Sequence, residues 1–316
     1  MTSAAADAAD NETAAIDTAA IDTMNGTVID AAGPAPESLL RQAIRLRRSQ
    51  IGVAITSALV AIAVFGRYVA PFGESAIVGD GLPNARHVTG ARFGSDYFGS
   101  DVWSRFLYGG RPILIQAVLA TILGVGLGST LGMLAAYMRG KFDEVLMRSL
   151  DVLLSFPQLL LSLVVIAIFS PSSLVVILTV GFTTVPRVAR VVRGAALQVV
   201  ERDFVAAADA LGESRLRVLF SEILPNVSAS LLVEANLRLT YSIGLIAGLG
   251  FLGFTPNLTA ANWGVMIQQN RSALTIQPWG VMLPTIAIAL LTVGTGLFAD
   301  GLGRTVAGID RGKAEV

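Results

Sequence analysis

The sequence predicts an all-α integral membrane protein with about six transmembrane helices. Of its 316 residues, 53% are hydrophobic and 15% are charged, whereas about 25% of the residues in a soluble domain are charged. The mean hydropathy is +0.65, and several stretches of roughly 20 residues are apolar enough to cross a bilayer core about 30 Å thick. Cysteine is absent and His87 is the single histidine, so the composition gives no support to thiol catalysis or to a metal site.

The N-terminal segment, residues 1–37, is rich in alanine, aspartate and threonine, and it contains the pentad AAIDT twice in tandem. All its charged side chains are acidic and no stretch could form a core, so we expect it to be disordered and cytoplasmic. Residues 38–50, with four arginines, predict an amphipathic basic helix suited to an anionic membrane surface. A plain basic flank of the first span is an equally good interpretation.

Six hydrophobic stretches are expected to span the membrane and to form one domain, residues 51–301, followed by a cytoplasmic tail, residues 302–316. The expected spans are residues 51–71, 112–137, 146–169, 174–192, 228–251 and 279–299.

Lysine and arginine predict the orientation, because they are enriched in cytoplasmic loops. With a cytoplasmic N-terminus, 16 of the 23 basic residues lie on the inner side, six lie on the outer side and Arg238 lies inside the fifth span. Both termini are therefore expected inside, with residues 72–111 forming an external loop.

Glycine and proline indicate how the spans pack. In the second span, small residues recur every fourth position, a spacing that lets another helix approach closely; they are Gly124, Gly128, Gly132 and Ala136. Lipid-facing glycines are the alternative. Pro157 and Pro186 are expected to kink or end the third and fourth spans.

The connection between the fourth and fifth spans, residues 187–225, is long and polar, which is unusual for a loop that only joins two helices. Asp203 is expected to N-cap a short helix, and Gly212 to end it in a left-handed conformation. Ser214 should cap a second helix that runs to Glu222. Residues sharing one face of the first helix are Phe204, Ala207, Ala208 and Leu211. Such a knob suits a groove in another protein.

This connection resembles the EAA loop of permease subunits of ABC importers, on the spacing of Ala206-Ala207-Ala208, Gly212 and Ile223-Leu224-Pro225. In that family the loop docks on the ATPase subunit and transmits its closure to the membrane helices. Ala206 stands where the family usually has Glu. The coupling residues that the resemblance implies are Phe204, Ala206, Ala207, Ala208, Leu211, Gly212, Ile223 and Pro225. An ordinary amphipathic surface hairpin is the alternative.

Other segments resemble the C-type subunits of dipeptide and oligopeptide permeases. FGSD at residues 93–96, GSDVWSR at 99–105 and GGR at 109–111 are similar to the family block GTDxxGRDxxSRxxxGxR, with Ser100 in place of an Arg. MRSLD at residues 147–151, GFLGF at 250–254 and NWG at 262–264 are similar to later family motifs, although Ile246 replaces a frequent Glu. The likeness covers residues 41–304.

The resemblance implies an ABC type I importer permease fold. It also implies a homologous permease subunit as partner, one or two ABC ATPase subunits and an extracytoplasmic solute-binding protein. That protein would dock on the external block, whose candidate residues are Asp96, Asp101, Arg105 and Arg111. The chain has no GxxxxGK[ST] phosphate loop, so we expect no cofactor in this chain, with ATP and magnesium bound by the partner ATPases.

Three of the charged residues within the expected spans are candidates for a functional role. Glu234 and Arg238 are four residues apart, the spacing of a helical ion pair, and they could line a translocation path or merely neutralise each other. Asp151 could serve the path or bond a neighbouring helix.

Peptide uptake is the favoured function, and nickel or oligosaccharide uptake by the same mechanism is the alternative. An ion-coupled secondary transporter would show inverted repeats and acidic relays, which we do not find. A structural or assembly protein would leave the knob and the external block unexplained.

Overall fold

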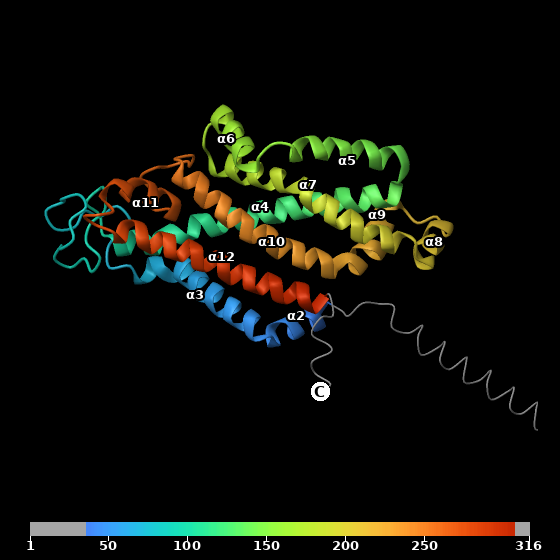
Figure 1. Ribbon diagram of the computed structural model, residues 1–316, viewed down its shortest axis with the longest axis horizontal. Coiled ribbons are helices and arrows are strands. Elements are labelled where there is room, and N and C mark those ends of the chain that lie inside the picture. Colours follow the sequence, from blue (N-terminus) through green and yellow to red (C-terminus); the bar gives the residue numbers. More distant parts are fainter. Residues whose placement is uncertain (1–35, 307–316) are drawn as a thin grey trace, which may run out of the picture.

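The computed structural model describes residues 36–306, and within that range the chain is helical apart from turns, loops and isolated β-bridges. Most of the N-terminal segment expected to be disordered, and of the expected tail, lies outside the described residues. Five helices of this range are long and apolar enough to span a membrane, and a bent helix pair makes a sixth. This confirms the predicted all-α membrane fold. Figure 1 shows the long helices side by side, with loops and α11 at one end and α8 at the other.

The predicted helix at residues 38–50 is divided between two helices. α2 (Pro36–Arg45) packs against α12, and α3 (Arg47–Val69) is the first span. Leu46 between them has an extended backbone, with φ −70° and ψ 127°. Ala43 is buried while Arg41 is exposed. α2 is therefore a separate amphipathic helix rather than a plain flank.

The second and fourth spans, α4 (Val102–Met138) and α7 (Ser173–Val200), form the most extensive helix pair. α4 faces α7 with its glycine stripe. A Cβ atom added at Gly124 would lie 1.9 Å from Thr184 Oγ1, and one at Gly132 would lie 2.4 Å from the carbonyl oxygen of Ala189. The stripe therefore packs against protein, and the lipid-facing alternative is wrong.

The third span is not the single helix predicted for residues 146–169. α5 (Gly140–Leu154) and α6 (Gln158–Phe169) meet at an angle of 84°. Pro157, between them, has no backbone N–H for a continuous helix. Pro186, in contrast, lies inside α7, which continues to Val200, so the expectation that it could end the fourth span is wrong.

The last two spans are α10 (Leu224–Phe251) and α12 (Trp279–Val306), with the short helices α11 (Trp263–Asn270) and η2 (Arg271–Ala273) between them. α12 packs between α3 and α10, and it is helical past the predicted domain boundary at residue 301, up to the last described residue. Trp263 is fully buried and its indole N–H donates to the carbonyl oxygen of Phe106 at 2.9 Å. α11 is thereby attached to the first turns of α4.

Candidate functional site

The first candidate site is the connection between α7 and α10, which we call the knob (residues 201–223). It contains α8 (Asp203–Ala210), α9 (Arg215–Arg217) and the π-helix η1 (Val218–Ile223). Arg202 occupies the N-cap position of α8, so the prediction that Asp203 caps this helix is wrong by one residue. Ser214 caps α9 as predicted, because its side chain accepts a hydrogen bond from the backbone N–H of Arg217.

Gly212 ends α8 in the left-handed conformation that the sequence predicts, with φ +75°. Its N–H donates to the carbonyl oxygen of Asp209 at 3.0 Å, and the N–H of Glu213 donates to that of Ala208 at 3.2 Å. These two bonds form a Schellman motif, which satisfies carbonyl groups at the helix end and requires a positive φ at the glycine position. The turn therefore fixes the angle between α8 and α9.

Apolar side chains are exposed on the outer surface of the knob, among charged ones such as Asp203 and Arg215. Leu211 is 83% exposed, and further exposed residues are Phe204, Ala206, Ala207, Leu216 and Phe220. The sequence pattern predicts Ala208 on this face, and that prediction is wrong. Ala208 is buried against the bundle together with Val205. Exposed large apolar side chains gathered on a surface mark a site of protein contact.

The inner side of the knob belongs to a continuous apolar cluster. Val205, Ala208 and Leu219 pack with residues of α4 and α7, among them Met133 and Val192. Close-packed interiors transmit displacement because they have few voids to absorb it. A push on the knob would therefore reach both helices.

The knob also continues directly into α10. The sequence predicted a separate second helix, but α9, η1 and α10 form one helical track from Arg215 to Phe251. The wide π-helical turn immediately precedes Pro225, whose ring would clash with a regular helix. The side-chain amide of Asn226 donates to the carbonyl oxygen of Glu222 at 2.6 Å. Ile223 is buried in this track and Pro225 is exposed.

Two polar contacts of the knob could not be found in the sequence. The Tyr137 hydroxyl, near the end of α4, donates to the carboxylate of Asp209, and Arg139 pairs with Glu201 at 3.3 Å. The two residues of the first contact are 72 positions apart in the sequence and those of the second are 62 apart, and nothing local in the sequence links them. Both tie the end of α4 to the knob.

The second candidate site is the opposite end of the bundle, which we call the cap (residues 70–101 and 252–278). Asp96, Asp101 and Arg105 are each at most 1% exposed. Asp96 Oδ2 lies 2.7 Å from Arg105 Nη1, and Arg105 Nη2 donates to the carbonyl oxygen of Thr259 at 2.9 Å. Asp101 caps α4 through the backbone N–H of Ser104.

These positions correct the interpretation of the external block. Three of its four candidate docking side chains are buried where the cap meets α4, so no partner could touch them. They hold the loop to α4 and to residue 259. Arg111 is exposed. The sequence pattern did not separate structural from accessible charges because burial depends on contacts between segments about 150 residues apart.

The third candidate site is the charged pair near the middle of α10. Glu234 Oε1 and Arg238 Nε are 2.8 Å apart, and their side chains are 5% and 11% exposed. The Arg238 guanidinium also lies 5.2 Å from the ring centroid of Tyr241, an exposed residue. The pair itself is therefore almost fully enclosed, and Arg238 borders the exposed ring of Tyr241. Asp151 instead pairs with Arg190 of α7, so it bonds a neighbouring helix, one of its two predicted roles.

Comparison with known proteins identifies the architecture. Residues 128–307, more than half of the chain, match the family described as binding-protein-dependent transport system inner membrane component. The chain belongs to this family. It is therefore a permease subunit, a multi-pass protein of the inner membrane, and the matched range contains the knob, the α10 pair and α11.

Relatives support the assignment over most of the chain. The permease is 36% identical over 277 residues to a Brucella suis protein named as a peptide transport system permease, which covers 85% of this chain and 91% of that protein. It is 34% identical to the glutathione transport system permease protein GsiD of Pectobacterium atrosepticum (77% and 81%). It is 32% identical to the dipeptide transport system permease protein DppC of Alkalihalophilus pseudofirmus (80% and 83%).

A solved structure supports the fold. A chain of the MetNI methionine ABC transporter, in an inward-facing conformation, superposes on the permease with a TM-score of 0.50 and 18% sequence identity. The match covers 65% of this chain and 96% of that chain.

The buried ion pair of the cap gives a first testable prediction for this permease. Arg105→Met removes the partner of Asp96 and leaves a carboxylate buried without a counter-charge, which typically costs about 3–5 kcal/mol. We expect a lower yield of folded permease and faster proteolysis of the cap. Arg111→Met is the matched control, because an exposed arginine near the same helix end changes stability by at most about 0.5 kcal/mol. Equal yield and equal protease resistance for the two variants would contradict the assignment.

Proposed function

We propose that this permease forms half of the translocation path of an ATP-driven importer of di- and oligopeptides. The complete importer would contain a homologous permease subunit, one or two ABC ATPase subunits and an extracytoplasmic solute-binding protein. Substrate would cross between the two permease subunits. The observation that carries the proposal is the set of relatives named for peptide, dipeptide and glutathione transport, which are 32–36% identical to this chain over most of its length.

The knob is proposed as the coupling element. Its exposed surface, around Phe204, Ala207 and Leu211, would enter a groove of the ATPase. Its buried side packs on α4 and α7, and its end is continuous with α10. Closure of the ATPases would therefore move three spans together. In this scheme the permease is not an enzyme and holds no cofactor; ATP and magnesium bind to the partner subunits.

The substrate class can be tested with the purified importer in proteoliposomes. With the binding protein outside and ATP within, labelled dipeptides, tripeptides and glutathione should accumulate, whereas nickel and oligosaccharides should not. If only nickel or only oligosaccharide accumulates, the proposed substrate class is wrong, while the ATP-driven mechanism still holds. Uptake that follows an ion gradient without ATP would overturn the mechanism and favour a secondary transporter.

The α10 pair is proposed to line the path and to meet the charged ends of a peptide. Replacing both residues, Glu234→Gln with Arg238→Gln, removes the charges without leaving either one buried alone. Because a hydrogen bond to a charged group contributes about 1.5–3 kcal/mol, we expect KM for a dipeptide to rise about tenfold or more at unchanged permease abundance. Unchanged KM and uptake would mean that the two charges only neutralise each other.

The orientation is proposed from the basic residues, with both termini cytoplasmic and the cap external. The natural chain lacks cysteine, so an introduced cysteine is the only residue of this chain that a thiol reagent can label. Ser75 in the cap and Ser221 in the knob are both exposed. Ser75→Cys should react with an impermeant thiol reagent added to intact cells, and Ser221→Cys should react only after the membrane is opened. The reverse labelling pattern would mean that the cap is cytoplasmic and the knob is external.

A further inference from the structure

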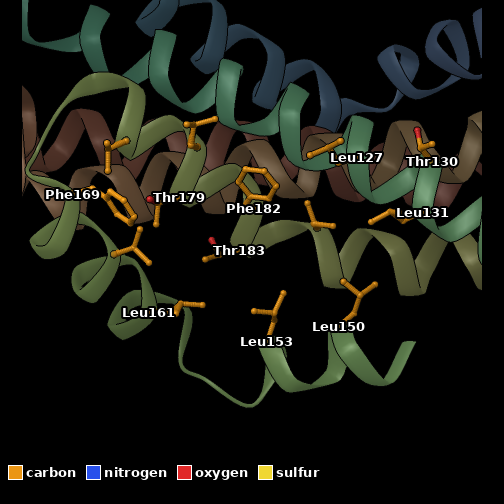
Figure 2. Close-up of a pocket in the computed structure, with 14 residues that line it drawn as sticks. Leu127, Thr130, Leu131, Leu150, Leu153, Leu161, Phe169, Thr179, Phe182 and Thr183 are labelled. Atoms are coloured by element: carbon orange, nitrogen blue, oxygen red, sulfur yellow. The ribbon is translucent and has the colours of Figure 1, made fainter. Parts of the chain in front are cut away.

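A groove lies beside the bend in the third span, between α5–α6 and the α4–α7 pair. α6 departs from the direction of α5 by 84°, and the space between this helix pair and the α4–α7 pair has a volume of about 690 Å³. Figure 2 shows Leu153 and Leu161 pointing into it from one side, and Leu127 and Phe182 from the other.

The chemistry of the lining restricts the occupant. All 14 lining residues are leucine, valine, phenylalanine or threonine. The hydroxyls of Thr130 and Thr183 donate to carbonyl oxygens of their own helices, at 2.8 and 3.0 Å. Among the residues that the structure describes, no charged group lines the groove, so the charged ends of a peptide would be left without partners there. A path for hydrophilic substrate is therefore excluded at this position.

The lining also differs from a surface that receives another helix. Helices in membranes approach each other over small residues, as Gly124 and Gly128 do within this chain. The groove contains no glycine, alanine or serine. Branched and aromatic side chains around a hollow suit a thin, flexible apolar chain better than a second helix.

The length and the charge at one end match a lipid. Val175 and Val185 of α7 both line the groove, and ten residues of helix measure about 15 Å, which is half of a bilayer core of about 30 Å. Towards the knob, Arg190 follows on α7 and pairs with Asp151, the neighbour of the lining residue Leu150. The two charged side chains remain more than half exposed.

We propose that this groove binds one acyl chain of an anionic phospholipid from the cytoplasmic leaflet, with the lipid phosphate against Arg190. Basic groups at the cytoplasmic ends of transmembrane helices recognise anionic headgroups in this way. The proposal uses the orientation proposed above, and it does not depend on the identity of the transported substrate.

Native mass spectrometry of the complete detergent-purified importer tests the proposal, with added phosphatidylglycerol or phosphatidylcholine as the probe. Leu161→Trp should fill the groove and weaken retention of phosphatidylglycerol about tenfold, because displacing even two methylene groups has an effect of that size. Leu160→Trp is the matched control: its side chain is 57% exposed on the same helix and does not line the groove, so retention should not change. Arg190→Gln should remove the preference for phosphatidylglycerol over phosphatidylcholine.

Three outcomes would overturn the proposal. The wild-type complex could retain no phosphatidylglycerol, or the two tryptophan variants could lose it equally. Alternatively, Leu153→Cys could form a disulfide, under an added oxidant, with a cysteine introduced in a helix of the partner permease. The last outcome would assign the groove to the subunit interface. Peptide uptake is measured separately, so a failure of the substrate proposal leaves this test unaffected.

Discussion

Gly212→Val is expected to abolish peptide uptake while the permease remains in the membrane at its normal level. The backbone at Gly212 has φ +75°, where a residue with a Cβ atom is strained by roughly 1–2 kcal/mol. A Cβ atom there would have no other atom within 4 Å, so the strain acts on the backbone alone. The turn can relax by rotating α8 against α9. That movement displaces Phe204 and Leu211 from the positions in which the ATPase would receive them.

The matched control for this variant is Gly212→Asn, because asparagine adopts the left-handed conformation far more readily than valine does. We expect near-normal uptake and substrate-stimulated ATP hydrolysis with asparagine, and loss of both with valine at equal permease abundance. Normal coupling in the valine variant would mean that another part of the chain contacts the ATPase. Loss of the protein itself would mean that the glycine serves folding rather than coupling.

The spans were predictable because membrane insertion depends on length and apolarity, which are local properties of the sequence. The turn at Gly212 was predictable for the same reason, since a glycine after a short helix is a local signal. The start of α4 at Val102 could not be predicted, and it lies ten residues before the predicted start of the second span. Arg105 makes that segment read as polar, and the sequence does not show that Asp96 pairs with it inside the folded protein.

In the candidate sites, too, the features that depend on local sequence were predictable and those that depend on contacts between distant segments were not. The exposed residues of the knob follow from helical periodicity, except that the buried side of α8 contains Ala208, whose neighbours come from α4 and α7. The docking role assigned to Asp96, Asp101 and Arg105 was wrong because a motif records which residues occur and not whether they face solvent. The angle between α5 and α6 also depends on packing, since Pro157 predicts a break but not its direction.

Gly128→Leu is expected to prevent assembly of the importer. A Cβ atom at this position would lie 2.6 Å from Val188 Cβ and 2.9 Å from the carbonyl oxygen of Val185, and leucine adds three more carbon atoms beyond it. α4 and α7 would have to separate along their main contact. Helices in lipid have no hydrophobic force that holds them together once close packing is lost. We therefore expect little assembled complex after detergent extraction, and no uptake.

Gly126→Leu provides the control on the same helix, two residues away. Gly126 is exposed, and a Cβ atom there would meet no atom within 4 Å. Both variants exchange glycine for leucine and so gain the same helix propensity, about 1 kcal/mol. The difference in complex yield and thermal stability between them therefore isolates the steric effect at the α4–α7 contact. If both variants assemble and transport equally well, α4 and α7 do not pack through this glycine stripe in the membrane.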